Sequence, residues 1–171
     1  MEYEERYLHL DAPVDIDKHV ICKYKVGTDL KMTTAAAAIA TEQSTGTWTK
    51  LSTLKEDNFL KRSGKVTKIE GNLATIAFPV EDFSLDIGGV PQILSIIAGN
   101  LFGLEALHAV RLEDVTFPKC ILKEFKGPKY GIDGMRSILK RPSKPLVGTI
   151  VKPKIGLSPK ETADYVYEAV M

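Results

Sequence analysis

The sequence of 171 residues lacks several features of composition that identify common classes of protein. Only two cysteines occur, Cys22 and Cys120, and their wide separation offers neither a disulfide framework nor a zinc motif. No charge of one sign dominates, because 23 basic and 22 acidic residues leave a net charge of +1. We therefore expect no nucleic-acid partner, since such proteins usually carry a basic surplus.

Long apolar runs are also scarce. Residues 1–13, MEYEERYLHLDAP, are acidic and lack the apolar segment of a secretory signal. The longest apolar stretch, Val90 to Leu104, is interrupted by Gln92, Asn100 and two glycines, so it is too short and too broken to cross a membrane. We expect no membrane partner and a cytoplasmic location. The 44% hydrophobic content is normal for a globular core.

Strand and helix patterns do alternate along the first part of the chain. Residues 33–42 are rich in alanine and predict a helix with Thr33 or Thr34 as its cap. The other patterns predict a strand at 19–26, an extended segment at 48–51, a hairpin of strands 66–69 and 73–78, a helix from Pro91 to about Leu101, and a strand within 104–117. This β-α-β-β-α-β order is typical of an α+β domain, an antiparallel sheet with helices on one face.

The second part of the chain begins with a short helix predicted at 131–139. The proline-bracketed linker Arg141–Pro145 follows it, and we predict a domain boundary there, between residues 1–140 and 146–171. A strand at 146–151 and a helix at 158–170 complete the chain. Ser158 and Glu161 have the spacing of a capping box for this helix. One strand and one helix cannot close a core, so they indicate the first unit of a larger, truncated structure.

The segment 148–157, GTIVKPKIGL, carries most of the chemical information. Side chains alternate across a strand, so a strand that continues through Pro153 places Lys152 and Lys154 on one face. Two ammonium groups held that close repel each other, which favours the neutral amine in one of them. Such a pair offers a positively charged binding site for phosphate and an amine that can act as a base. The end of a strand before a helix is also where a (β/α) barrel places its catalytic groups.

Three segments together resemble the large subunit of ribulose-1,5-bisphosphate carboxylase/oxygenase (RuBisCO). They are 41–49 (TEQSTGTWT), 98–118 (AGNLFGLEALHAVRLEDVTFP) and 148–157, and their order and spacing match the amino-terminal part of that family. The sequence TIVKPK looks most like the archaeal, form III branch of the family. Members of that branch typically take part in AMP and nucleoside salvage. The resemblance implies a ferredoxin-like amino-terminal domain followed by a (β/α)8 barrel. It also implies a homodimer, or an oligomer of dimers, with head-to-tail subunits and shared active sites.

The resemblance also assigns roles to single residues. The family's enzymes carboxylate ribulose 1,5-bisphosphate with CO2 and give two molecules of 3-phosphoglycerate. Lys152 matches the lysine that moves protons during enolisation and final protonation, and Lys154 matches the neighbour that tunes it and contacts substrate. Glu42 matches the acid that pairs with a lysine on the barrel's mobile loop. Among substrate-binding residues, Asn100 matches an asparagine that reaches the metal-bound substrate from the partner subunit, and Thr47 and Trp48 match a pair that helps to bind one phosphate.

The sequence departs from the family pattern at two positions. Gln43 stands where a serine is usual, and Ile150 stands where plant-type enzymes have a threonine, although isoleucine is common in the archaeal branch. The family's Mg2+ is held by a carbamylated lysine, an aspartate and a glutamate. No segment here resembles that site, so we expect the metal ligands beyond Met171 and expect the 171-residue chain alone to be inactive.

Two alternative functions remain open at this point. A RuBisCO-like enolase or isomerase would enolise another phosphorylated sugar without carboxylating it. Such relatives usually alter several of Glu42, Thr47, Trp48 and Asn100, all of which are present here. A stand-alone ferredoxin-like interaction module is the other alternative. It predicts a folded monomer with residues 146–171 packed onto its own domain.

Overall fold

The computed structural model describes residues 4–48, 56–153 and 155–171 of the chain. These residues divide into two compact units, Met1–Phe125 and Lys126–Met171, and each is described by itself.

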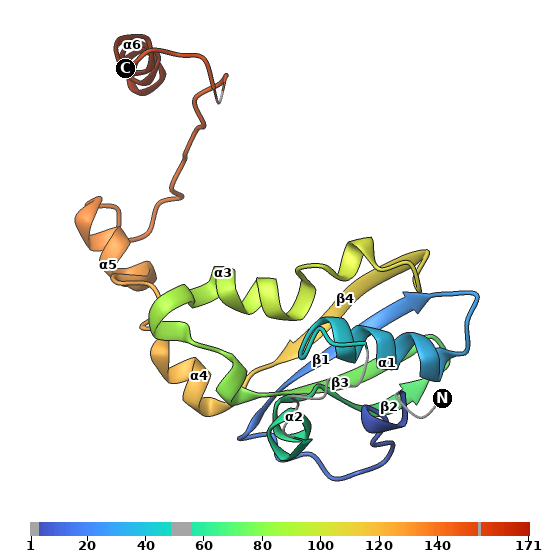
Figure 1. The fold of residues 1–171 in the computed structure, drawn as a ribbon. Coiled ribbons are helices and arrows are strands. Elements are labelled where there is room, and N and C mark those ends of the chain that lie inside the picture. The colour runs from blue at the N-terminus through green and yellow to red at the C-terminus, as the bar shows by residue number, and fades with distance from the viewer. Residues whose placement is uncertain (1–3, 49–55, 154) are drawn as a thin grey trace. The chain divides into compact units, whose positions relative to one another are not determined.

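The first unit is built on a four-stranded antiparallel sheet in the order β2-β3-β1-β4 (Figure 1). Its strands and longer helices are β1 (His19–Gly27), α1 (Met32–Glu42), β2 (Lys65–Glu70), β3 (Leu73–Pro79), α3 (Leu85–Ala98) and β4 (Ala109–Thr116). Helices α1 and α3 lie on the same face of the sheet (Figure 1). The order β1-α1-β2-β3-α3-β4 confirms the predicted ferredoxin-like α+β fold. Shorter helices add to it: α2 (Glu56–Arg62), α4 (Lys119–Glu124), and the 3-10 turns η1 (Glu4–Arg6), η2 (Val80–Asp82) and η3 (Leu101–Gly103).

The core forms between the sheet and α1. Alternate residues of β1, from Val20 to Val26, are buried, while Lys23 and Lys25 point to solvent. Helix α1 buries five alanines, whose small side chains let the helix lie close to the sheet. Burial raises the pKa of the Cys22 thiol to about 12, so this core cysteine stays protonated and unreactive at neutral pH.

The hairpin and the amino-terminal segment complete this sheet. Gly71 has a φ of 59° in the tight turn between β2 and β3, a conformation that glycine adopts without strain. Before β1, Leu8 forms a parallel bridge with Val66 of the edge strand β2. Tyr7 next to it is fully buried and makes an edge-on ring contact with Phe59. The segment therefore covers part of an edge that would otherwise be open to other strands.

Two helix starts differ from the prediction. The N-cap of α1 is Lys31, which makes no side-chain cap hydrogen bond, so the predicted cap at Thr33 or Thr34 is wrong; both threonines lie within the first turn. Helix α3 begins at Leu85, six residues before Pro91. Gly89, with a φ of 53°, breaks the helix, and Pro91 then stands in the first turn of the second piece, where its missing N–H costs nothing.

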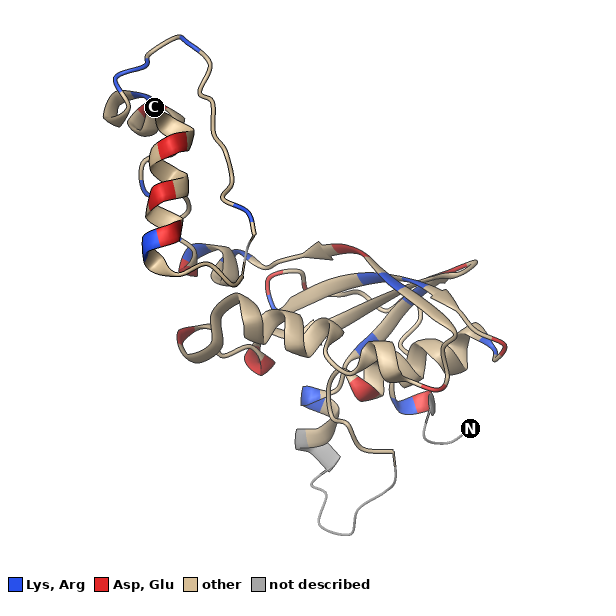
Figure 2. Cartoon of the chain, turned by 90° about the horizontal axis from the view of Figure 1, so that it is seen from above, with Lys and Arg blue, Asp and Glu red and all other residues tan. Residues whose placement is uncertain are grey.

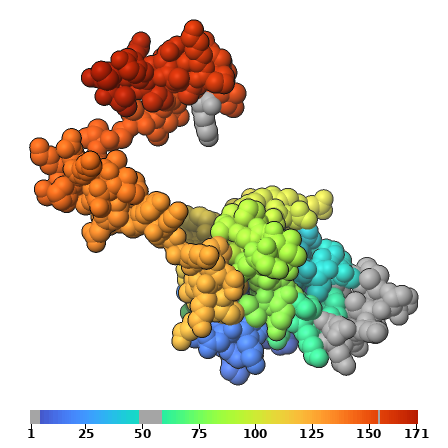
Figure 3. Space-filling model, turned by 90° about the vertical axis from the view of Figure 1, so that its left-hand side faces the viewer, coloured from blue at the N-terminus to red at the C-terminus, as the bar shows by residue number. Residues whose placement is uncertain are grey.

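Leu85–Gly103 is one segment with the length and mean hydropathy (1.3) of a membrane span. The break at Gly89 and the end of α3 at Ala98 interrupt it, and Ile93, Ile97 and Leu101 on one side are buried in the core. The segment is therefore a helix of the folded domain. Its other side lies on the surface of the first unit (Figure 3) and exposes Ile87, Val90 and Leu94.

The second unit contains two helices, α5 (Gly131–Ile138) and α6 (Pro159–Val170). Ser158 and Glu161 form the predicted capping box, and acidic residues recur along α6 (Figure 2). The strand predicted at 146–151 is wrong, since these residues are irregular. A strand needs a hydrogen-bonded neighbour, and the described residues of this unit supply none.

Candidate functional site

Glu42, the last residue of α1, is the centre of the candidate site. The indole Nε1 of Trp48 donates a hydrogen bond to Oε2 of Glu42 at 3.3 Å, and Nδ2 of Asn100 donates to Oε1 at 3.2 Å. The carboxyl end of a helix carries partial negative charge, which disfavours a carboxylate there. The two N–H donors offset that cost, so the structure joins three of the predicted site residues from two separate segments, 41–49 and 98–118.

Asn100 is held in place by the core on both sides of it in the chain. Ile97 and Leu101 are buried, and the hydroxyl of Tyr24 in β1 donates to the carbonyl of Ile97 at 2.6 Å. Gly99 ends α3, and a Cβ at that position would overlap the carbonyl oxygen of Ser95. The site therefore requires a residue without a side chain directly before Asn100.

The amide of Asn100 has a defined orientation. An ionised carboxylate only accepts hydrogen bonds, so the NH2 group of Asn100 must face Glu42. The carbonyl oxygen Oδ1 is then the atom left for a ligand. An amide oxygen can accept a hydrogen bond from a substrate hydroxyl or approach a cation.

These residues line a pocket of about 760 Å³. Its walls come from the end of α1, from Trp48, and from the segment after α3: Glu42, Trp48, Gly99, Asn100, Gly103, Leu104, Glu105 and Ala106. Among the described residues of this lining there are two carboxylates and no lysine or arginine. The two carboxylates would repel a phosphate unless residues outside this lining supplied cations. The pocket is therefore incomplete as a phosphate-binding site.

Thr47 lies beside the pocket and does not line it. The side chain is half-buried, and its hydroxyl donates to the carbonyl of Thr45 at 3.1 Å. The hydroxyls of Thr45 and Tyr7 are 2.7 Å apart, so this loop is tied to the buried Tyr7. The phosphate-binding roles of Thr47 and Trp48 stay predictions.

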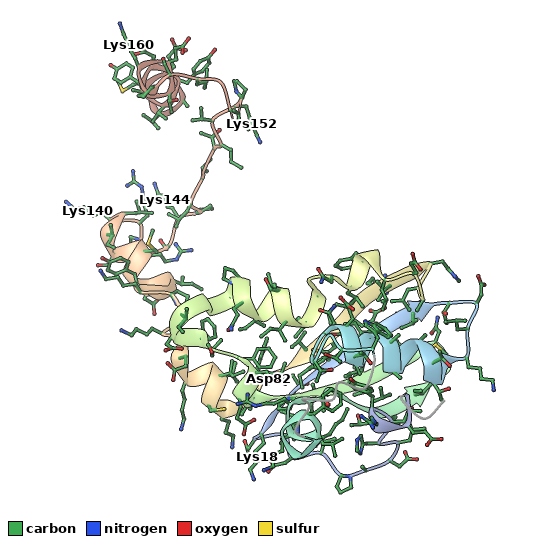
Figure 4. The ribbon with its side chains drawn as sticks, in the orientation of Figure 1. Lys18, Asp82, Lys140, Lys144, Lys152 and Lys160 are labelled. Carbon is green, nitrogen blue, oxygen red and sulfur yellow. The ribbon has the colours of Figure 1, made fainter. Side chains whose placement is uncertain are left out.

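The predicted lysine pair belongs to the second unit. Lys152 is exposed in a bend at residues 152–153, after the irregular segment that was expected to be a strand (Figure 4). Lys154 lies outside the described residues. The two lysines are therefore not shown side by side on one strand face, and their catalytic roles stay predictions.

The described residues do not offer a metal centre. In those ranges no three His, Cys, Asp or Glu side chains gather in a group that could hold an ion. Glu42 and Glu105 are the two acidic residues in the described lining of the pocket.

Sequence reasoning missed part of the pocket. Glu105 and the glycines Gly99 and Gly103 were not singled out, although all three lie within the quoted segment 98–118. The only signal for them was the motif itself. Gln43, which departs from the family's usual serine, is buried, and its Nε2 has no hydrogen-bond partner among the described residues.

Comparison with protein families gives matches to both parts of the chain. Residues 6–121 match the "Ribulose bisphosphate carboxylase large chain, N-terminal domain", and residues 131–171 match the catalytic domain of the same large chain. The chain belongs to the ribulose bisphosphate carboxylase large-chain family. This confirms the family resemblance of the three quoted segments.

Similar curated proteins of this carboxylase family come from archaea. The chain is 36% identical over 160 residues to the ribulose bisphosphate carboxylase of Methanosarcina acetivorans, covering 92% of this chain and 37% of that protein. It is 43% identical over 143 residues to that of Methanocaldococcus jannaschii, covering 78% of this chain and 33% of that protein. The chain thus spans about a third of the length of these relatives.

Solved structures of the family resemble the whole described chain. The octameric Rubisco of Pyrococcus horikoshii superposes with a TM-score of 0.77 at 37% identity, covering 97% of this chain and 39% of that one. The dimeric archaeal Rubisco of Hyperthermus butylicus gives 0.78 at 35% identity, with 98% and 40% covered. These likenesses support the carboxylase fold for the amino-terminal unit.

Proposed function

We propose that this chain supplies the amino-terminal part of a ribulose-bisphosphate carboxylase, which converts ribulose 1,5-bisphosphate and CO2 to two 3-phosphoglycerates. The observation that carries the proposal is the meeting of Glu42, Trp48 and Asn100 at one pocket. Asn100 lies 58 residues after Glu42 in the sequence, whereas Trp48 lies only 6 residues after it, and the family resemblance had assigned each of them to the active site. A fold kept for packing alone would have no reason to bring them together on an open surface.

The chemistry of the pocket fits a contribution to binding. Glu42 would pair with a cation from the rest of the enzyme, and Asn100 would present Oδ1 to the substrate. The described residues of the lining include no cation for the substrate's phosphates. Those charges would come from other parts of the enzyme, including Lys152 and Lys154, with Lys152 moving the proton at the substrate carbon.

The remaining features of the complete enzyme are proposals of the same kind. Mg2+, which supplies electrostatic stabilisation when bound, would be held outside the described residues, because they lack a ligand set for it. We also propose a homodimer or oligomer of dimers with shared sites, a cytoplasmic location, a domain boundary at Arg141–Pro145, and a role in AMP and nucleoside salvage.

A chimaera tests the assignment directly. This chain would replace the corresponding third of the Methanocaldococcus jannaschii carboxylase, and CO2 fixation would be measured with labelled bicarbonate. We expect fixation by the chimaera and none by the 171-residue chain alone. A folded chimaera without fixation, or turnover by the chain alone, would contradict the proposal; thermal melting checks folding.

Matched variants of the chimaera test the individual residues. Asn100→Ala and Glu42→Gln should each lower kcat/KM by about tenfold or more, because each removes a charge-assisted or ligand-directed hydrogen bond. Asn72→Ala and Glu70→Gln remove the same groups from the β2–β3 hairpin, which lies outside the pocket lining. Equal losses in both sets would mean that the pocket has no special role.

Proton exchange at the substrate carbon separates carboxylase from the RuBisCO-like alternative. Lys152→Ala should abolish exchange in the chimaera if Lys152 is the base. Retained exchange would refute that role. If the protein to which this chain belongs exchanged the proton but fixed no CO2, the enolase or isomerase alternative would hold instead.

A further inference from the structure

A second hollow lies at the end of the sheet where β1 and β2 begin and β3 ends. It has a volume of about 610 Å³, and none of its described lining residues also lines the Glu42 pocket. Four basic side chains, one histidine and a single carboxylate surround it: Lys18, Lys61, Arg62, Lys65, His19 and Glu81, with Pro79. The chain as a whole is nearly neutral, so this concentration of positive charge is local to the hollow, which is called the basic hollow below.

Buried backbone holds the walls of the basic hollow in place. His19 pairs with Pro79 in the sheet, and the N–H of Val80 donates to the carbonyl of Lys18 at 2.9 Å. On the other side, the connection from α2 to β2 is buried at Ser63 and Gly64. The N–H of Gly64 donates to the hydroxyl of Ser44 at 2.9 Å. The basic residues therefore project from fixed positions: Lys18 lies directly before β1, Lys61 and Arg62 end α2, and Lys65 begins β2.

Part of the positive charge is already paired. Nη1 of Arg62 contacts Oδ1 of Asp82 at 2.9 Å, and Nζ of Lys18 lies 3.6 Å from Oδ2 of Asp15. The contact with Asp82 leaves the other guanidinium nitrogens of Arg62 able to donate. Lys61 and Lys65 form no ion pair among the described residues, and Glu81 is the lining's only carboxylate. Figure 4 labels Lys18 and Asp82 at this end of the sheet.

The stability of the individual helices and strands does not explain why these basic side chains lie close together. Lys61 and Arg62 lie in the last turn of α2, where cations stabilise a helix. Lys18 and Lys65 come from other elements and gain nothing from that helix end. Like charges brought together repel each other, so a shared counter-ion is the simplest reason for their arrangement.

We propose that the basic hollow binds a small anion that carries two or more phosphate charges. Arg62 can donate two parallel hydrogen bonds to phosphate oxygens, while the lysines act as point charges around them. The volume admits a metabolite. Apart from the imidazole of His19, the described lining residues include no ring on which a base could stack, so a phosphate group fits better than a nucleic-acid strand.

Titration with pyrophosphate tests the basic hollow in the 171-residue chain. Binding would be measured by calorimetry and by amide chemical shifts, with sodium chloride adjusted to keep the ionic strength constant. We expect saturable binding, with shifts centred on residues 18–19, 61–65 and 79–81. The double variant Lys61→Ala/Lys65→Ala should weaken binding at least about tenfold, since each charge-assisted hydrogen bond is worth roughly that factor.

Two control variants make the result decisive. Lys23→Ala/Lys25→Ala removes two exposed lysines from β1 outside the basic hollow and should leave the affinity unchanged. Lys61→Arg/Lys65→Arg keeps the charge and should retain binding. Absence of saturable binding, equal loss in both alanine variants, or shifts confined to other residues would overturn the proposal. The carboxylase assignment does not depend on any of these outcomes.

Discussion

Similar apolar residues are buried in the first unit of the chain and exposed in the second. In the first unit Ile76 of β3 is fully buried, whereas in the second unit Ile150 is 77% exposed and Val147 is 97% exposed. Both isoleucines lie in short apolar runs of comparable strand propensity. The difference is that β3 has neighbours on both sides, β1 and β2, while residues 146–151 have no pairing partner in the described chain.

Helices and strands respond differently to this lack of partners. Helix α6 forms because its hydrogen bonds are local and its first turn is capped by Ser158 and Glu161. The strand predicted at 146–151 is absent because every one of its hydrogen bonds would be to another strand. The comparison shows which half of a β-α unit can exist alone.

Proteolysis should separate the two units most sharply. A protease of broad specificity suits the linker itself, because proline follows Arg141, Lys144 and Lys152 and protects these bonds from trypsin. We expect cleavage within residues 126–158 to leave a resistant fragment that ends near Phe125 or in the linker, because the described residues of this segment are largely exposed, and irregular outside α5. Mass spectrometry identifies the fragments. A resistant tail would instead favour the stand-alone module with residues 146–171 packed onto it.

Matched isoleucine truncations test the difference in burial. Ile76→Ala should lower the free energy of unfolding by about 2–5 kcal/mol, because it removes fully buried methylenes and leaves a cavity. Ile150→Ala should change it by less than about 0.5 kcal/mol, since the side chain is exposed. Urea unfolding followed by circular dichroism measures both. Similar costs would show that residues 146–151 are packed in solution.

Alkaline pH should weaken the first unit through Cys22. The thiol releases its proton near 9.0 in the unfolded chain and near pH 12 in the folded chain. The folded chain thus holds more protons in this window, and the free energy of unfolding should fall by up to about 1 kcal/mol per pH unit above pH 9. Urea unfolding from pH 8 to pH 10.5 measures the slope. Cys22→Ala should reduce the slope below pH 10, where the raised pKa of the buried Tyr24 hydroxyl contributes little, and Cys120→Ala should not; equal slopes in both variants would contradict the assignment.

Capping should matter locally in the second unit. Ser158→Ala removes the hydroxyl that accepts from the N–H of Glu161 and should cost α6 about 1 kcal/mol. Carbon chemical shifts of residues 159–170 would report the loss of helix. Ser143→Ala, in the linker, serves as the control. Unchanged helix content would mean that contacts elsewhere, and not the cap, stabilise α6.

Prediction from the sequence succeeded where the signal was local or repeated along one element. Alternation located β1, the turn at Gly71 located the hairpin, and the S-x-x-E spacing located the start of α6. The start of α3 was missed because Gly89 adopts a φ of 53° and joins two helical pieces across a break. Nothing in the periodicity of residues 85–98 signals that break.

For the candidate site too, some features could be predicted from the sequence and others appeared only in the structure. The quoted motifs identified Glu42, Trp48 and Asn100 without any geometry. The structure added that Nδ2 of Asn100 faces Glu42, and that Gly99 is needed because of the Ser95 carbonyl. It also added the basic hollow, whose residues lie in three separated stretches of sequence and look like ordinary surface charges.

The sequence by itself determined the order of the four strands and two longer helices of the first unit, the family, and the residue types at the Glu42 pocket, because propensities, turns and motifs act over a few neighbouring positions. The tertiary structure alone decided which distant residues meet and which apolar segments are buried. Both depend on strand pairing and close packing between remote parts of the chain, and no local pattern encodes such contacts.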